Sequence, residues 1–194
     1  MLQVVIELNE RYTLAEQAQM ALEGGATWLL IRPQGLTDEV LREEGKDVTA
    51  LCRGHGAILT MEGHTELASD LGLHGVLLMK RHPNPVDIRA LFGAEAIIGA
   101  EVTSGAEAAA LEKADIDYAV LTQLHGAAPI IEEARKQGAL IPFVAMGDFT
   151  PEEAGQLIMA GFNGICTGKR IFSSDDSVAA VGEYLDRLAG KAAE

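Results

Sequence analysis

The sequence predicts an α/β protein, and within that class a (β/α)8 TIM barrel. Short runs of β-branched and aliphatic residues alternate with segments of helical periodicity along the whole chain. Such alternation indicates a parallel sheet covered by helices. Eight such units in 194 residues lie at the compact end of the range for this barrel, whereas a doubly wound sheet usually has about five or six strands.

The eight predicted strands are short and mostly apolar. In chain order they are LQVVIEL (2–8), TWLLIRP (27–33), AILTM (57–61), GVLLM (75–79), AIIGAEV (96–102), DYAVLTQ (117–123), IPFVAMG (141–147) and GICTG (164–168). No linker, low-complexity tract or change in composition interrupts their succession. A single domain spanning residues 1–194 is therefore expected.

The segments between the strands have helical periodicity. Most of them open with Thr, His or Pro and close on Gly, which are ordinary start and stop signals of helices. They are residues 13–25, 37–56, 64–72, 85–93, 105–114, 129–138 and 150–161, followed after the eighth strand by 176–190. Each strand is thus followed by a helix, as the barrel requires.

Composition restricts the class of protein. Apolar residues make up 48% of the chain, enough for a sizeable core, yet no window approaches 18 uninterrupted apolar residues and the amino terminus lacks the features of a signal peptide. Cys52 and Cys166 lie far apart in apolar patterns, so we expect core thiols. A net charge of −14 disfavours nucleic acid and anionic lipid as partners. We expect a soluble, cytoplasmic protein.

Candidate site residues follow from the fold, because the loops after the strands form the functional face of a TIM barrel. The polar residues and glycines at these positions are Glu7 and Asn9; Arg32 and Gln34; Thr60, Glu62 and His64; Lys80 to His82; Glu101, Thr103 and Ser104; Gln123 and His125; Gly147 and Asp148; and Gly168 to Arg170.

The loops after the seventh and eighth strands resemble the phosphate cradle common in TIM barrels. Gly147 and Gly168 permit close backbone approach, and amides at a short helix start donate to anions. Lys169 and Arg170 would add positive charge. The alternative is that the glycines merely turn the chain while the two bases are solvated. Asp148 opposes an anion if it points into the cradle, but not if it caps the following helix.

Arg32 ends an otherwise apolar strand, where a guanidinium is costly unless it meets a carboxylate or a phosphate. Glu7, at the end of the neighbouring strand, is a natural partner. A structural ion pair and a ligand contact both remain open. His125 follows the sixth strand and is a candidate catalytic acid or base, since imidazole titrates near neutral pH; the alternative is an ordinary surface histidine.

A metal site has weaker support in the sequence. Glu62, His64 and His82 follow the third and fourth strands, but they lack a tight motif such as two histidines on one helical turn. Glu62, together with Glu7, Glu101 and Gln123, is expected to line the site. We expect no bound metal.

Four segments carry a resemblance to a known family. ALEGGATWLLIRPQ (21–34), ELASDLGLHGVLLMK (66–80), AIIGAEVTSGAEAAALEKADIDYAV (96–120) and IPFVAMGDFTPEEAGQLIMAGFNGI (141–165) resemble corresponding segments of the thiamine phosphate synthases and their sister group, the TenI-type thiazole tautomerases. The ending RIFSSDDSVAAVGEY is most similar to the tautomerases. The resemblance covers nearly the whole chain and implies the same barrel.

The match is closer in the scaffold than in the site implied by the resemblance. Of the Gln, Arg and Lys expected after the second strand, only Arg32 is present. The Asn-Asp-Arg expected after the third strand falls on Glu62, Gly63 and His64, and the magnesium-binding aspartate expected after the fourth falls near His82. Neither expected metal carboxylate is matched.

Later positions also differ from the resemblance. The serine expected after the fifth strand falls on Glu101, and the glycine-rich segment with Thr-Lys after the sixth strand is absent. After the seventh strand Gly147 is present, but Asp148 replaces the second glycine. The histidine that follows the sixth strand in the tautomerases aligns with Gln123, two residues before His125.

The resemblance implies a protein of thiamine biosynthesis that binds thiazole phosphate or a similar phosphorylated small molecule. The synthase reaction joins a pyrimidine methyl diphosphate to a thiazole phosphate, and magnesium stabilises the leaving diphosphate. Because its ligands are unmatched, no cofactor is expected and synthase activity is in question. A metal-free tautomerase and a noncatalytic ligand-binding or partner-interacting paralogue are the alternatives. A homodimer remains open.

Overall fold

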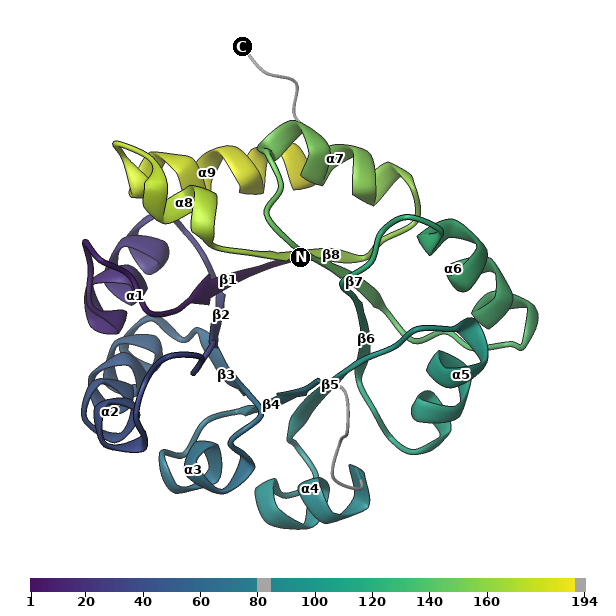
Figure 1. Cartoon of the computed structure of the whole chain (residues 1–194), viewed down its shortest axis with the longest axis horizontal. Helices are drawn as coiled ribbons and strands as arrows, with labels where there is room; N and C mark the ends of the chain where they lie inside the picture. Colours follow the sequence, from purple (N-terminus) through teal and green to yellow (C-terminus); the bar gives the residue numbers. More distant parts are fainter. Residues whose placement is uncertain (80–84, 191–194) are drawn as a thin grey trace.

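A computed structural model of the chain, describing residues 1–79 and 85–190, shows eight parallel strands in a closed barrel. Neighbours in the sequence are neighbours in the barrel, and β8 closes it against β1, as Figure 1 shows. The strands are β1 (Leu2–Ile6), β2 (Trp28–Ile31), β3 (Ile58–Glu62), β4 (Gly75–Leu78), β5 (Ile97–Glu101), β6 (Tyr118–Leu121), β7 (Phe143–Met146) and β8 (Gly164–Thr167). The predicted TIM barrel is confirmed.

Helices surround the barrel as an outer ring (Figure 1). They are α1 (Leu14–Glu23), α2 (Asp38–His55), α3 (Thr65–Asp70), α4 (Pro85–Phe92), α5 (Gly105–Lys113), α6 (Ala127–Lys136), α7 (Pro151–Met159), α8 (Lys169–Ser173) and α9 (Ser177–Leu188). Two details differ from the sequence prediction: α6 begins at Ala127 rather than Pro129, and β8 is followed by the short α8 before the last helix. In the described part of the chain, no helix has both the length and the apolar character needed to cross a lipid bilayer.

Strand geometry produces two separate apolar cores. Successive side chains of a strand point to opposite faces, so one set fills the barrel and the other packs under the helices. The buried residues of the inner core are Val5, Trp28, Leu30, Leu77, Tyr118, Val120, Val144, Met146 and Cys166. The rings of Trp28 and Tyr118, from the opposite strands β2 and β6, form a T-shaped contact across the interior. Their centroids are 5.4 Å apart and their planes are nearly perpendicular, at 81°.

We expect Gly99→Ala to lower the free energy of unfolding by about 1 to 3 kcal/mol, the usual effect of overpacking. A Cβ at this position of β5 would lie 2.1 Å from Cζ of Tyr118, whose ring Trp28 holds in place. The control is Gly182→Ala in α9, where nothing lies within 4 Å of the added Cβ. That change should raise stability by about 0.5 to 1 kcal/mol. Urea unfolding measures both, and equal effects would contradict this packing.

The amino-terminal end of the barrel is fastened by polar residues that immediately precede alternate strands. These residues come before β4, β6 and β8, and each accepts a hydrogen bond from an amide at the start of the neighbouring strand, β3, β5 or β7. The bonds are His74 Nδ1 with the Leu59 amide, Asp117 Oδ2 with the Ile98 amide, and Asn163 Oδ1 with the Phe143 amide, at 3.0, 2.7 and 2.9 Å. Because these groups are used for stability, the opposite end of the barrel is the place to look for function.

Candidate functional site

Arg32 lies at the carboxyl-terminal end of the barrel interior, which we call the mouth. Its Nη1 is 3.0 Å from Glu7 Oε2 and its Nε is 3.0 Å from Glu62 Oε2. Its Nη2 lies 3.6 Å from the sulfur of Met146. The three side chains come from the ends of β1, β3 and β7, so the guanidinium extends across the mouth. The ion pair with Glu7 considered from the sequence is present, and Glu62 is a second partner.

Strand alternation places these charges. The Arg32 amide donates to the Ile6 carbonyl at 2.9 Å, which continues the pairing of β1 with β2 by one residue. Every second side chain of β2 points into the barrel, so Arg32 points inward like Trp28 and Leu30. On β3 the same alternation directs Glu62 to the same side as Thr60. Burial lowers the pKa of Arg32, but hydrogen bonds and Coulombic attraction from Glu62 and Glu7 outweigh it, so the guanidinium pKa is raised.

A groove runs from the mouth between the loop that follows β1 and helix α8, and we call it the α8 groove. Its cavity volume is about 470 Å³. It is lined by Glu7, Leu8, Asn9, Glu10, Arg11, Gln17, Lys169, Phe172 and Ser173. Sequence reasoning had named Glu7, Asn9 and Lys169 but missed the other residues, because some depend on how the loop folds and the rest lie within α1 and α8.

The loop between β1 and α1 is held in one conformation. Gln17 is completely buried, and its amide group donates to the Glu7 carbonyl at 2.8 Å and accepts from the Glu7 amide at 3.2 Å. Asn9 Oδ1 accepts from the amides of Arg11 and Tyr12 at 2.8 and 3.2 Å. The wall of the α8 groove is thus preformed rather than dependent on a ligand.

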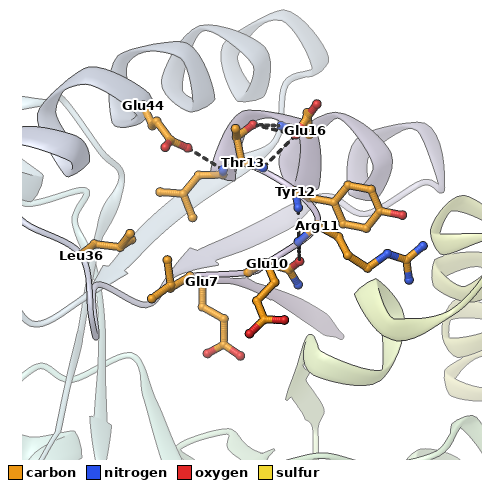
Figure 2. A pocket seen from close by; sticks show the side chains of 11 residues that line it. Glu7, Glu10, Arg11, Tyr12, Thr13, Glu16, Leu36 and Glu44 are labelled. Carbon is orange, nitrogen blue, oxygen red and sulfur yellow. Dashed lines mark hydrogen bonds between the residues drawn. The ribbon is translucent and has the colours of Figure 1, made fainter.

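The same loop borders a second pocket of about 260 Å³ on the side of α1 and α2 (Figure 2). In this pocket Thr13 and Glu16 form the capping box of α1, and Glu44 Oε2 accepts from the Leu14 amide at 2.6 Å. Figure 2 shows Glu7 and Glu10 directed away from these two contacts. The carboxylates of Glu16 and Glu44 therefore serve to anchor the loop and the start of α1.

Helix α8 starts directly after Gly168, the position at which TIM barrels commonly bind phosphate. A Cβ on Gly168 would lie 2.1 Å from the Val5 carbonyl oxygen, so only glycine fits this close approach to β1. Among the described residues, no side chain caps the first turn of α8. The amide of Gly147, a glycine predicted to lie at the phosphate cradle, donates to the Cys166 carbonyl at 3.1 Å.

The two bases after Gly168 differ in their surroundings. Arg170 Nε lies 3.2 Å from Asp148 Oδ1, and both side chains are about half exposed. Lys169 is exposed, and no ion pair or hydrogen bond engages its ammonium group within the described residues. Of the two bases after Gly168, Lys169 is therefore the one whose charge is available to a ligand of the α8 groove.

Asp148 does not cap α7, contrary to one sequence hypothesis. Thr150 is the cap: its hydroxyl accepts from the Glu153 amide at 3.2 Å, and Glu153 accepts from the Thr150 amide at 2.8 Å. This capping box satisfies the first turn of α7. Asp148 is left to pair with Arg170.

The remaining predicted site residues lie in other sectors of the same end of the barrel. Gln123 and His125 are exposed in the loop between β6 and α6, and β6 stands opposite β2 (Figure 1). Glu101 is 6% exposed and accepts from the Thr122 hydroxyl at 2.7 Å. The structure therefore places His125 across the barrel from Arg32, and its catalytic role stays a prediction.

The metal ligands considered from the sequence are not brought together among the described residues. Glu62 bonds Arg32, and His64 lies 3.5 Å from Asp38 with a left-handed backbone at the start of α3. His82 lies outside the described residues, as do Lys80 and Arg81. Across residues 1–79 and 85–190, no three His, Cys, Asp or Glu side chains form a cluster able to hold a metal ion.

The two cysteines are buried and unpaired with each other, as the apolar patterns predicted. Burial raises the pKa of the Cys52 thiol to about 11 and that of Cys166 to about 12. Both are therefore protonated near neutral pH and are poor nucleophiles.

Comparison with known proteins agrees with this architecture. The family model described as thiamine monophosphate synthase matches residues 2–171. A thiamine-phosphate synthase from Bacteroides thetaiotaomicron is 29% identical, with 95% of this chain and 96% of that protein covered. One from Nitrosococcus oceani is 32% identical, with 91% and 86% covered.

A solved structure is similar over nearly the whole chain. The thiamine phosphate pyrophosphorylase from Pyrococcus furiosus superposes with a TM-score of 0.83 at 27% identity, covering 97% of this chain and 95% of that one. The resemblance seen in the sequence is confirmed. The chain belongs to the thiamine monophosphate synthase family, TMP-TENI.

Proposed function

We propose that this member of the family binds a thiazole phosphate or a similar phosphorylated small molecule in the α8 groove, in thiamine metabolism. The observation that carries the proposal is Lys169, an exposed base with no ion-pair partner in the described part of the chain, beside a cavity of about 470 Å³ at the functional end of the barrel. In a chain with a net charge of −14, local donors are required to attract an anion.

Backbone donors support the same location. The first amides of a helix lack partners within the helix, and no side chain of residues 1–79 or 85–190 caps the start of α8. Gly168 brings this start against β1 without a side chain in the way. Amides and Lys169 together offer a phosphate both hydrogen bonds and positive charge. Such backbone donors do not depend on the side chains that the synthase reaction requires.

The magnesium implied by the synthase family does not fit the donors present in the described residues. Glu62 is bonded to Arg32, Gly63 has no side-chain oxygen, and His64 is a poor ligand for a hard cation. We therefore assign no chemical step to a metal. A metal-free reaction with His125 as acid or base is the remaining enzymatic proposal.

Lys169→Ala is expected to weaken binding of thiazole phosphate by about 1 to 3 kcal/mol, the range for a charge-assisted hydrogen bond. Titration calorimetry with thiazole phosphate, and with inorganic phosphate, measures the change. Lys113→Ala, at the other end of the barrel in the last turn of α5, is the matched control and should bind like the unchanged protein. Equal binding by both variants would contradict a phosphate site at Lys169.

Asp148→Asn is expected to strengthen phosphate binding about two- to fivefold, because it frees Arg170 and removes a negative charge beside α8. Both groups are half exposed, so the gain should diminish as ionic strength rises. The same titration at low and high salt tests this. A weaker affinity in the variant would show that Asp148 supports the ligand rather than opposing it.

A noncatalytic ligand-binding or partner-interacting role is the second candidate. The observation in its favour is the mouth itself, where Arg32 is held by two carboxylates. Turnover separates the two candidates: replacement of His125 by Asn should abolish thiazole tautomerisation if the protein is an enzyme. If the unchanged protein shows no turnover yet binds thiazole phosphate, the noncatalytic role is favoured.

A further inference from the structure

The mouth of the barrel contains a cation that is already paired with two carboxylates. Each of the three nitrogens of the Arg32 guanidinium faces an acceptor: Glu62 and Glu7 at 3.0 Å and the Met146 sulfur at 3.6 Å. These acceptors lie on three sides of the mouth. An incoming anion that approaches the guanidinium also approaches these two carboxylates, which repel it.

The charge balance opposes such an approach. One guanidinium and two carboxylates leave a net charge of −1, and the three side chains are 24%, 28% and 23% exposed, so solvent screens them less than surface charges. Separating Arg32 from a carboxylate would leave a partly buried charge uncompensated. A cationic group, or an N–H of an uncharged ring, would instead meet carboxylate oxygens.

We propose that Glu7 and Glu62 determine ligand specificity, by making the mouth accept an uncharged or cationic group and reject phosphate or diphosphate. Glu7 also lines the α8 groove, so the two regions are adjacent. If the proposed function is correct, a ligand lies with its phosphate at Lys169 and a nitrogen-containing ring toward Glu7 and Arg32. The exclusion of anions by Glu7 and Glu62 does not itself depend on the site at Lys169.

Titration calorimetry with inorganic pyrophosphate tests the proposal. Glu7→Gln combined with Glu62→Gln keeps the size of both side chains and one acceptor oxygen on each, while removing their charge. The double variant should bind pyrophosphate at least tenfold more tightly than the unchanged protein. Further replacement of Arg32 by Gln should abolish the gain.

A matched control carries the same change in net charge at the other end of the barrel. Glu23→Gln with Glu95→Gln, at the end of α1 and before β5, should gain less than twofold. Thermal unfolding establishes that each variant is folded. If the double variant at the mouth does not fold, Glu62→Gln alone should still bind pyrophosphate at least threefold more tightly.

The two proposals can fail separately. The gain should persist in a Lys169→Ala background, even if Lys169 proves irrelevant to phosphate binding. An unchanged pyrophosphate affinity after removal of the carboxylates, or a gain that persists without Arg32, would overturn the proposed role of Glu7 and Glu62. Neither result would decide whether thiazole phosphate binds beside α8.

Discussion

Purified protein supplied with a pyrimidine methyl diphosphate, thiazole phosphate and magnesium is expected to form thiamine phosphate at a rate far below about 1 per second, the lower end of typical turnover. The reaction needs stabilisation of a departing diphosphate. In this chain Arg32 forms ion pairs with both Glu62 and Glu7. The usual metal and guanidinium contributions are therefore not provided by these residues.

The rate is measured with both substrates at saturating concentration. A synthase such as that of Bacteroides thetaiotaomicron, 29% identical to this chain, is the positive control under the same conditions. Turnover at about 1 per second or more would overturn this expectation and show that the departures from the family pattern are tolerated.

Replacing Arg32 by Ala is expected to lower the free energy of unfolding by about 2 to 4 kcal/mol, somewhat less than for a fully buried ion pair because the group is 24% exposed. The change leaves Glu7 and Glu62 facing each other without the cation. It also removes the contact with Met146. Denaturant unfolding at neutral pH measures the loss.

Acidity provides an independent readout of this prediction. Carboxylates that repel each other are relieved by protonation, so the deficit of the Arg32→Ala variant should be smaller in acid than at neutral pH. Arg32→Lys keeps the charge but not the two-sided hydrogen bonding, and should lose less stability. A deficit that is the same at every pH would show that packing, rather than charge, explains the loss.

The fold was predictable because its signals are local and repeated. Each apolar run is followed by a helical segment, and caps such as Thr13, Thr37, Ser104 and Thr150 mark where helices begin. The boundary of α6 was missed because Gly126, in a left-handed conformation, starts the helix before Pro129. Proline fits the first turn of a helix, so it did not mark the start.

The site was less predictable because it depends on contacts between distant residues. The pair formed by Glu7 and Arg32 followed from neighbouring strands, and the same argument applied to β3 would have found Glu62. The role of Asp148 was harder to predict, because its partner Arg170 lies in the following βα unit. The capping box of Thr150 and Glu153 also had to be recognised first. The conformation of the loop after β1 depends on Gln17, whose burial has no signal in the sequence.

The most direct test of the central claim is a crystal structure of the protein soaked with thiazole phosphate. We predict the phosphate in the α8 groove, within hydrogen-bonding distance of the first amides of α8 and of Lys169 Nζ, with the ring toward Glu7. Crystals that show no ligand at millimolar concentration, or a phosphate bound to Arg32 in the mouth, would contradict the account.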